Sequence, residues 1–148
     1  MKRYFSSAVC SNGYINTFNT IYKSKPSSDV HIIYCCDDFE RSVFFEQLQR
    51  KLPGYNITLF NTFYDDSVNG IFVENTNTYI LSDQDYCHIT PLLPGAWEKH
   101  TNLSEGTEYP PDLVREIIQR KNNENRHYKK ACVMLKKAST VKEQLHIF

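Results

Sequence analysis

Four aspartates follow two short apolar segments and could together hold a divalent cation. They are Asp37, Asp38, Asp83 and Asp85. The first two come directly after residues 30–36, and the second two come shortly after residues 78–81. Carboxylate oxygens are the ligands that Mg²⁺ and Ca²⁺ prefer, so the pattern predicts a metal site if the two segments are neighbouring strands. Aspartate after a strand is also a common helix cap or turn former, which gives the same residues a structural interpretation.

Cys87 and His88 follow the second acidic pair and add groups for further chemistry. The histidine could act as a general acid or base, and the cysteine as a nucleophile. The pair does not predict a zinc site, because no second pair with matching spacing is present. The five cysteines include no C-x-x-C motif. Their odd number favours free thiols in a reducing cytosol.

The elements that must position these residues follow an α/β pattern. Residues 30–36 are apolar and β-branched, which is typical of a central buried strand. Residues 41–52 carry apolar side chains at helical spacing, and residues 55–60 alternate as a second strand. This strand–helix–strand order predicts a βαβ unit with a parallel strand pair.

Three further segments complete the expected arrangement. Residues 71–73 and 78–81 flank a polar turn, which predicts a hairpin or strand pair. Residues 14–23 have the apolar spacing of a short helix. Residues 111–147 predict a C-terminal helical segment. Its polar stretch at 121–127 either belongs to one long helix or separates two helices.

The segment after the first strand occupies the place where α/β proteins bind phosphate. In the P-loop pattern G-x-x-x-x-G-K-[ST], backbone amides surround the phosphates and the lysine reaches the β and γ phosphates. Residues 35–42 read Cys-Cys-Asp-Asp-Phe-Glu-Arg-Ser, so only Arg41 and Ser42 survive in kind. These two residues are the candidate remnants of a nucleotide-binding site.

Several short motifs come in a defined order along the chain. They are Asn12-Gly13-Tyr14, residues 35–43, Ser67-Val68-Asn69-Gly70-Ile71, Asp83 with His88, Pro94-Gly95-Ala96, Asn102-Leu103, and the spaced Tyr128, Ala131, Leu135 and Ala138. This order resembles the first module of a poorly characterised family of bacterial ATPases that are typically built from two tandem P-loop modules. The resemblance implies that residues 1–148 form a single degenerate P-loop-like α/β domain. We therefore expect a three-layer P-loop-NTPase-like fold with a mainly parallel sheet.

The chain departs from that family at the loop that would bind phosphate. Every loop glycine is replaced, so Cβ atoms occupy space that phosphates need and disfavour positive φ angles. Asp37, Asp38 and Glu40 add up to three negative charges. Each like-charge pair at ~4 Å costs about 4 kcal/mol at an effective dielectric of about 20. We therefore expect no ATP binding at this loop at millimolar or lower concentration.

Three functional hypotheses follow from these features. The first is a non-catalytic relative that keeps its fold as a scaffold or interaction module, with no cofactor and no enzymatic activity. The second is an ATP- or nucleotide-binding protein with an atypical phosphate loop, in which Arg41 and Ser42 are remnants and Arg41 contacts a phosphate carried by a partner. The third is a divalent-metal-dependent hydrolase that holds Mg²⁺ through the clustered aspartates.

Charge and hydropathy narrow the choice of partner. Residues 1–110 carry a net charge of −5 and residues 111–148 a net charge of +5. The basic helix has few aromatic side chains for stacking bases, so we do not expect nucleic acid binding. No run of eighteen apolar residues and no secretory signal is present, so we expect a cytoplasmic protein with no membrane partner. The expected partner is another protein or a second copy of the chain.

Overall fold

The computed structural model describes residues 1–84 and 88–146, and the chain divides into two compact units. Unit 1 contains Met1–Ala8 and Asn16–Gly106, and unit 2 contains Val9–Ile15 and Thr107–Phe148. In the part of the chain that the structure describes, no helix is both long and apolar enough to cross a bilayer.

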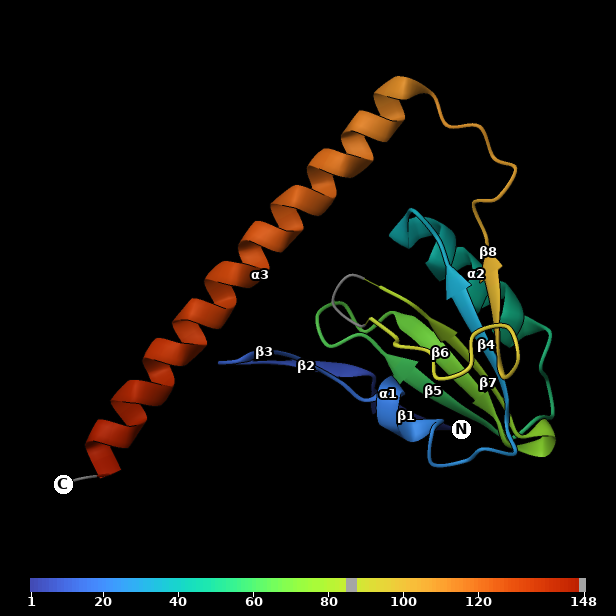
Figure 1. Cartoon of the computed structure of the whole chain (residues 1–148), viewed down its shortest axis with the longest axis horizontal. Coiled ribbons are helices and arrows are strands. Elements are labelled where there is room, and N and C mark those ends of the chain that lie inside the picture. The colour runs from blue at the N-terminus through green and yellow to red at the C-terminus, as the bar shows by residue number, and fades with distance from the viewer. Residues whose placement is uncertain (85–87, 147–148) are drawn as a thin grey trace. The chain divides into compact units, whose positions relative to one another are not determined.

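Unit 1 is built around a six-stranded sheet in the order β1-β5-β6-β7-β4-β8 (Figure 1). The strands are β1 (Lys2–Phe5), β4 (Asp29–Tyr34), β5 (Ile57–Asn61), β6 (Val68–Val73), β7 (Thr78–Ser82) and β8 (Glu98–Asn102). Its helices are α1 (Phe18–Ile21), α2 (Asp38–Arg50) and the 3-10 turn η1 (Glu74–Thr76). The β1–β5, β4–β7 and β4–β8 pairs are parallel, whereas β6 is antiparallel to both of its neighbours.

The prediction of a three-layer P-loop-NTPase-like fold with a mainly parallel sheet is wrong. The sheet is mixed, because the hairpin β6–β7 inserts between β4 and β5. The strand–helix–strand unit is present, but its two strands are therefore not neighbours. The second face of the sheet is covered by the four-residue α1 and by loops, so the described residues of unit 1 supply no full helical layer there.

The two faces of the sheet carry separate apolar clusters because side chains alternate along each strand. On one face, Phe45 of α2 packs with Leu59, Ile71 and Val73. On the other face, the core is larger and more aromatic. Its buried members are Phe18, Tyr22, Val30, Ile32, Phe60, Tyr79, Leu81 and Ile89.

Gly70 allows α1 to pack closely on this second face of the sheet. A Cβ atom at Gly70 would lie 2.8 Å from Cζ of Phe18, so only glycine leaves room for the ring. The Phe18 ring also meets Phe60 edge-on, with 5.5 Å between ring centroids. Asn-Gly pairs are typical of turns, but Asn69-Gly70 is part of strand β6, where Gly70 allows close packing.

A fully buried glutamate, Glu98, organises the loop before β8. Its carboxylate accepts hydrogen bonds from the backbone N–H groups of Leu92 and Leu93, both at 2.8 Å, and from the Tyr22 hydroxyl at 3.0 Å. Burial acts to raise the pKa of Glu98, but these three donors outweigh it, so the pKa is lowered.

Unit 2 contains most of the two-stranded sheet formed by β2 (Ser7–Cys10) and β3 (Gly13–Asn16), together with helix α3 (Pro111–His146). The polar stretch 121–127 does not interrupt α3, and Figure 1 shows one continuous helix. The predicted helix 14–23 is only partly correct, because residues 14–16 belong to β3 and the helix is restricted to α1.

Candidate functional site

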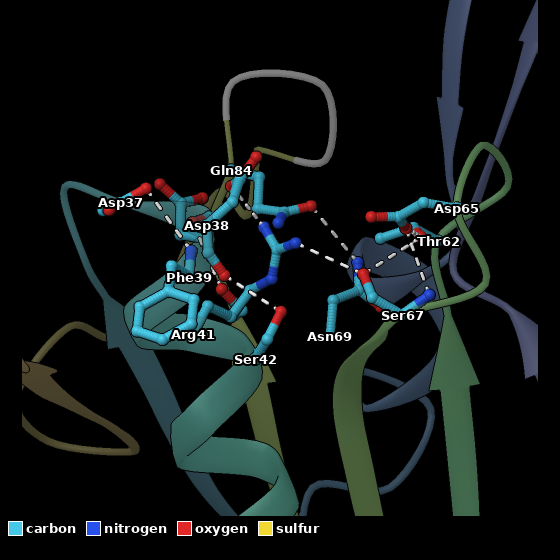
Figure 2. Close-up of polar contacts among 12 residues, drawn as sticks. Asp37, Asp38, Phe39, Arg41, Ser42, Thr62, Asp65, Ser67, Asn69 and Gln84 are labelled. Carbon is cyan, nitrogen blue, oxygen red and sulfur yellow. Dashed lines mark hydrogen bonds and ion pairs between the residues drawn. The ribbon is translucent and has the colours of Figure 1, made fainter. Parts of the chain in front are cut away.

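Most of the predicted site residues lie at the edge of the sheet where β4, β5, β7 and β8 end. These strands run in the same direction, so the segments that follow them lie at one edge. Figure 2 shows the start of α2 facing the β5–β6 loop and Gln84 at this edge. Ligand sites of α/β proteins usually lie at this edge of the sheet. Whether a polar group here can bind a ligand depends on whether it already has a partner within the protein.

The first two aspartates are used to begin α2. Asp37 is the N-cap residue, and its carboxylate accepts a hydrogen bond from the N–H of Phe39 at 3.4 Å. Asp38 and Glu40 follow in the first turn, where negative charge complements the helix dipole. The Ser42 hydroxyl donates to the carbonyl oxygen of Asp38 at 3.0 Å. Residues 37–42 thus stabilise a helix start.

Arg41 is the central residue of this edge and is fully buried. Its Nη1 lies 2.6 Å from Oδ1 of Asp38, and its Nη2 donates to the Ser67 hydroxyl at 3.3 Å. With the Gln84 amide oriented so that its oxygen faces the guanidinium, that oxygen also accepts from Nε of Arg41 at 3.0 Å. Burial acts to lower the pKa of Arg41, but Asp38 and Tyr64 outweigh it, so the pKa is raised. Arg41 is therefore a buried, charged side chain that connects the start of α2 to the β5–β6 loop.

The β5–β6 loop lies next to Arg41, and it holds a carboxylate that the sequence analysis missed. Asp65 accepts hydrogen bonds from the Thr62 hydroxyl and, at 3.1 Å, from the N–H of Ser67. Burial acts to raise the Asp65 pKa, but these donors lower it on balance. Burial, the largest influence on the neighbouring Tyr64, raises its pKa to about 12. The polar run after a strand was the available signal for this loop.

Asp83 anchors the chain beyond β7. Its Oδ1 accepts a hydrogen bond from the N–H of Ile89 at 2.6 Å, and Nδ1 of His88 lies 3.1 Å from the same carboxylate. The His88 carbonyl in turn accepts hydrogen bonds from the side chains of Asn16 and Asn19. Asp83 and His88 therefore lie in contact, and the His88 carbonyl connects this loop to the segment before and within α1.

The predicted metal site and the predicted nucleophile include residues that lie outside the described part of the chain, namely Asp85 and Cys87. Among the residues that the structure describes, no group of three or more His, Cys, Asp or Glu side chains could hold a metal ion. Arg41 and Asp38 lie together as an ion pair, and Ser42 is bonded to the backbone of the same helix turn.

A second polar cluster joins the ends of β4 and β8. The Ser104 hydroxyl donates to Oε2 of Glu40 at 2.8 Å and lies 3.2 Å from Sγ of Cys36, and the N–H of Cys36 donates back to it at 3.1 Å. Burial raises the pKa of the adjacent Cys35 to about 11. A nucleophilic thiolate needs an electropositive environment, whereas Glu40 places a carboxylate here. Burial therefore favours the neutral form of the Cys35 thiol, and the contacts of Ser104 give the cluster a structural role.

Comparisons with models of protein families, with curated proteins and with solved structures found no significant match to this chain. The resemblance to the tandem P-loop ATPases stays a prediction.

Proposed function

We propose that the protein is a non-catalytic interaction module, in which unit 1 is a scaffold and helix α3 pairs with α3 of a second copy of the chain. The charged side chains at the sheet edge support this proposal because Arg41, Asp37 and Asp83 each have an internal contact. Arg41 is bonded to Asp38, Asp37 caps α2, and Asp83 is bonded to Ile89. Nucleotide binding through Arg41 would require breaking the ion pair that neutralises a buried charge.

The observation that carries the proposal is the pattern of apolar side chains on α3. Counting heptads with Val114 at position a, the a and d positions hold mostly apolar residues. In order they are Val114, Ile117, Lys121, Glu124, Tyr128, Ala131, Leu135, Ala138, Lys142 and Leu145. Positions b, c and f are polar throughout α3 except at Val133. This spacing is typical of helices that pair along a seam.

The seam and its flanking positions e and g are exposed at two apolar patches. The N-terminal patch consists of Leu113, Val114 and Ile118, and the C-terminal patch consists of Met134, Leu135, Val141 and Leu145. Their exposed fractions range from 37% to 70%, which is high for apolar residues of this size. Between the patches, the Tyr14 ring of the β2–β3 hairpin packs against Tyr128, with 5.1 Å between centroids.

A second copy of the same helix matches this pattern. The centres of the two patches lie about 24 residues apart, which is about 36 Å along a helix axis. A parallel, in-register pair places each patch against its own counterpart and the polar stretch 121–127 against itself. The lysines at positions b and c, such as Lys129 and Lys136, then lie on the outer faces of the pair. We therefore propose that α3 forms a parallel, in-register pair with α3 of a second copy.

The test is the mass of the chain in solution, measured by light scattering after size exclusion. We expect the double variant Leu135→Glu/Val141→Glu to reduce a dimer to single chains, because it places two carboxylates at position a of the seam and two more at the flanking position g. Both side chains are about half exposed within one chain, so the variant should keep its helix content. The matched control Gln144→Glu adds a carboxylate at position c and should leave the mass unchanged. Single-chain mass for the unmodified protein, or equal effects of both variants, would refute the proposal.

We place this module in the reducing cytoplasm. The support is that all four described cysteines, Cys10, Cys35, Cys36 and Cys132, are free thiols.

A further inference from the structure

A groove crosses the second face of the sheet in unit 1, away from the sheet edge described above. It has a volume of about 400 Å³. That size lies within the range of small-molecule sites, which combine an apolar, aromatic lining with a few polar groups. Its walls come from β1, from the segment around α1, and from the strands β5, β6 and β7.

The floor of the groove exists because α1 covers only part of this face. Strand register places Lys2, Thr58, Phe72 and Tyr79 in one row across β1, β5, β6 and β7. The Phe18 ring covers the next row at Gly70. In the first row Thr58 and Tyr79 are buried, whereas Phe72 is partly exposed, so this row presents the Phe72 ring to the groove.

The aromatic rings are arranged to accept a flat ligand. Phe72 and Tyr79 are stacked, with 4.2 Å between centroids and 21° between ring planes. Tyr4 lies beside Phe60 at 6.5 Å and is 56% exposed, so one of its surfaces is available at the rim. Offset stacking on such rings favours planar aromatic groups.

The charged groups that line the groove are two lysines, Lys2 and Lys25, and one carboxylate, Glu74. Nζ of Lys25 lies 4.4 Å from the centroid of Phe72 and 6.0 Å from that of Tyr79. Among the described residues, no carboxylate lies within 4 Å of this ammonium, whereas Lys2 is 3.9 Å from Glu74. Lys25 is therefore the lysine of the groove whose ammonium group can pair with the acidic group of a ligand.

We propose that this groove binds a planar aromatic anion of up to nucleotide size, with its ring stacked against Tyr4 and Phe72 and its acidic group at Lys25. The proposal does not depend on pairing through α3, because every lining residue belongs to unit 1. The acidic group is a phosphate or a carboxylate, and the test separates these two sources.

The test is calorimetric titration of the full chain with two probe pairs. Adenosine monophosphate is compared with adenosine, and indole-3-acetate with indole. We expect at least one anion to bind about fivefold more tightly than its uncharged counterpart, as an exposed charge contact gives. A preference for adenosine monophosphate over adenosine identifies the acidic group as a phosphate. A preference for indole-3-acetate over indole identifies it as a carboxylate.

Variants assign the binding to the groove. Lys25→Gln should remove the fivefold preference for the anion, and Tyr4→Ala should weaken both members of the pair. Both side chains are exposed, so neither change should unfold the protein. The control is Lys23→Gln, because Lys23 lies outside the groove and donates to the Thr90 carbonyl. No binding of any probe at millimolar concentration, or equal effects of the two lysine variants, would overturn the proposal.

Discussion

Replacing Asp38 by Asn should destabilise the protein more than replacing Arg41 by Met, although Asp38 is the more exposed partner. The Asp38 side chain is 53% exposed and that of Arg41 is 1% exposed. Asp38→Asn leaves a buried guanidinium without its carboxylate, and breaking such a pair costs about 3–5 kcal/mol. We expect the lower end, about 3 kcal/mol, because Asp38 is half solvated. Arg41→Met removes the buried charge and lets Asp38 hydrate, so we expect about 1–2 kcal/mol.

Urea unfolding monitored by the fluorescence of Trp97, the single tryptophan, measures both costs in unit 1. Asp37→Asn is the matched control: it removes one negative charge from the same helix start but keeps a good N-cap, so its cost should stay below about 0.5 kcal/mol. The double variant of Asp38 and Arg41 should cost less than the two single costs combined. Two results would refute the structural role of the pair. One is an Asp38→Asn variant with unchanged stability, and the other is an Arg41→Met variant that loses as much stability as Asp38→Asn or more.

Gly70→Ala should cost about 1–3 kcal/mol by overpacking, and Phe18→Leu should recover part of that loss in urea unfolding. No rescue would mean that the Phe18 ring does not set the requirement for glycine. The lowered pKa of Glu98 means that its carboxylate stabilises the fold above the unfolded value of about 4.3. That stability is lost as the pH falls through the folded pKa. Glu98→Gln should therefore destabilise the protein at pH 7 and differ less from the unmodified chain at pH 3, and a cost independent of pH would contradict this.

The central strands and α2 could be predicted from sequence because their signals are local. Strand β4 is rich in buried β-branched residues, Val30, Ile32 and Ile33, and Pro53-Gly54 follows α2 closely. The edge strands β1 and β8 were missed because neither has the apolar alternation of a half-buried strand. All of β1 is exposed, and β8 reads Glu-Lys-His-Thr-Asn and is exposed after the buried Glu98. The strand order depends on pairing across the chain, so local patterns did not reveal that β6–β7 inserts between β4 and β5.

The candidate site was predictable in position but not in role. Sequence placed Asp37, Asp38 and Arg41 after a strand, where ligands often bind. Their roles depend on partners distant in the sequence, such as Ser67, which lies 26 residues from Arg41. The contact of Ser104 with Cys36 spans 68 residues and had no local signal. The polar pattern of the sequence thus located the sheet edge. The tertiary contacts then showed that the charged side chains there are paired with other groups of the same chain.

Sedimentation equilibrium of the unmodified chain at low and high salt tests the central claim, that α3 pairs with itself, most directly. Each helix segment carries a net charge of +5, so two copies of α3 repel each other and salt screens that repulsion. We therefore predict a mass of twice the 17.4 kDa chain that persists or strengthens in high salt. A single-chain mass at all concentrations would contradict the account. So would a dimer that dissociates in salt, because it would mean that the basic helix docks on the acidic residues 1–110 of another copy.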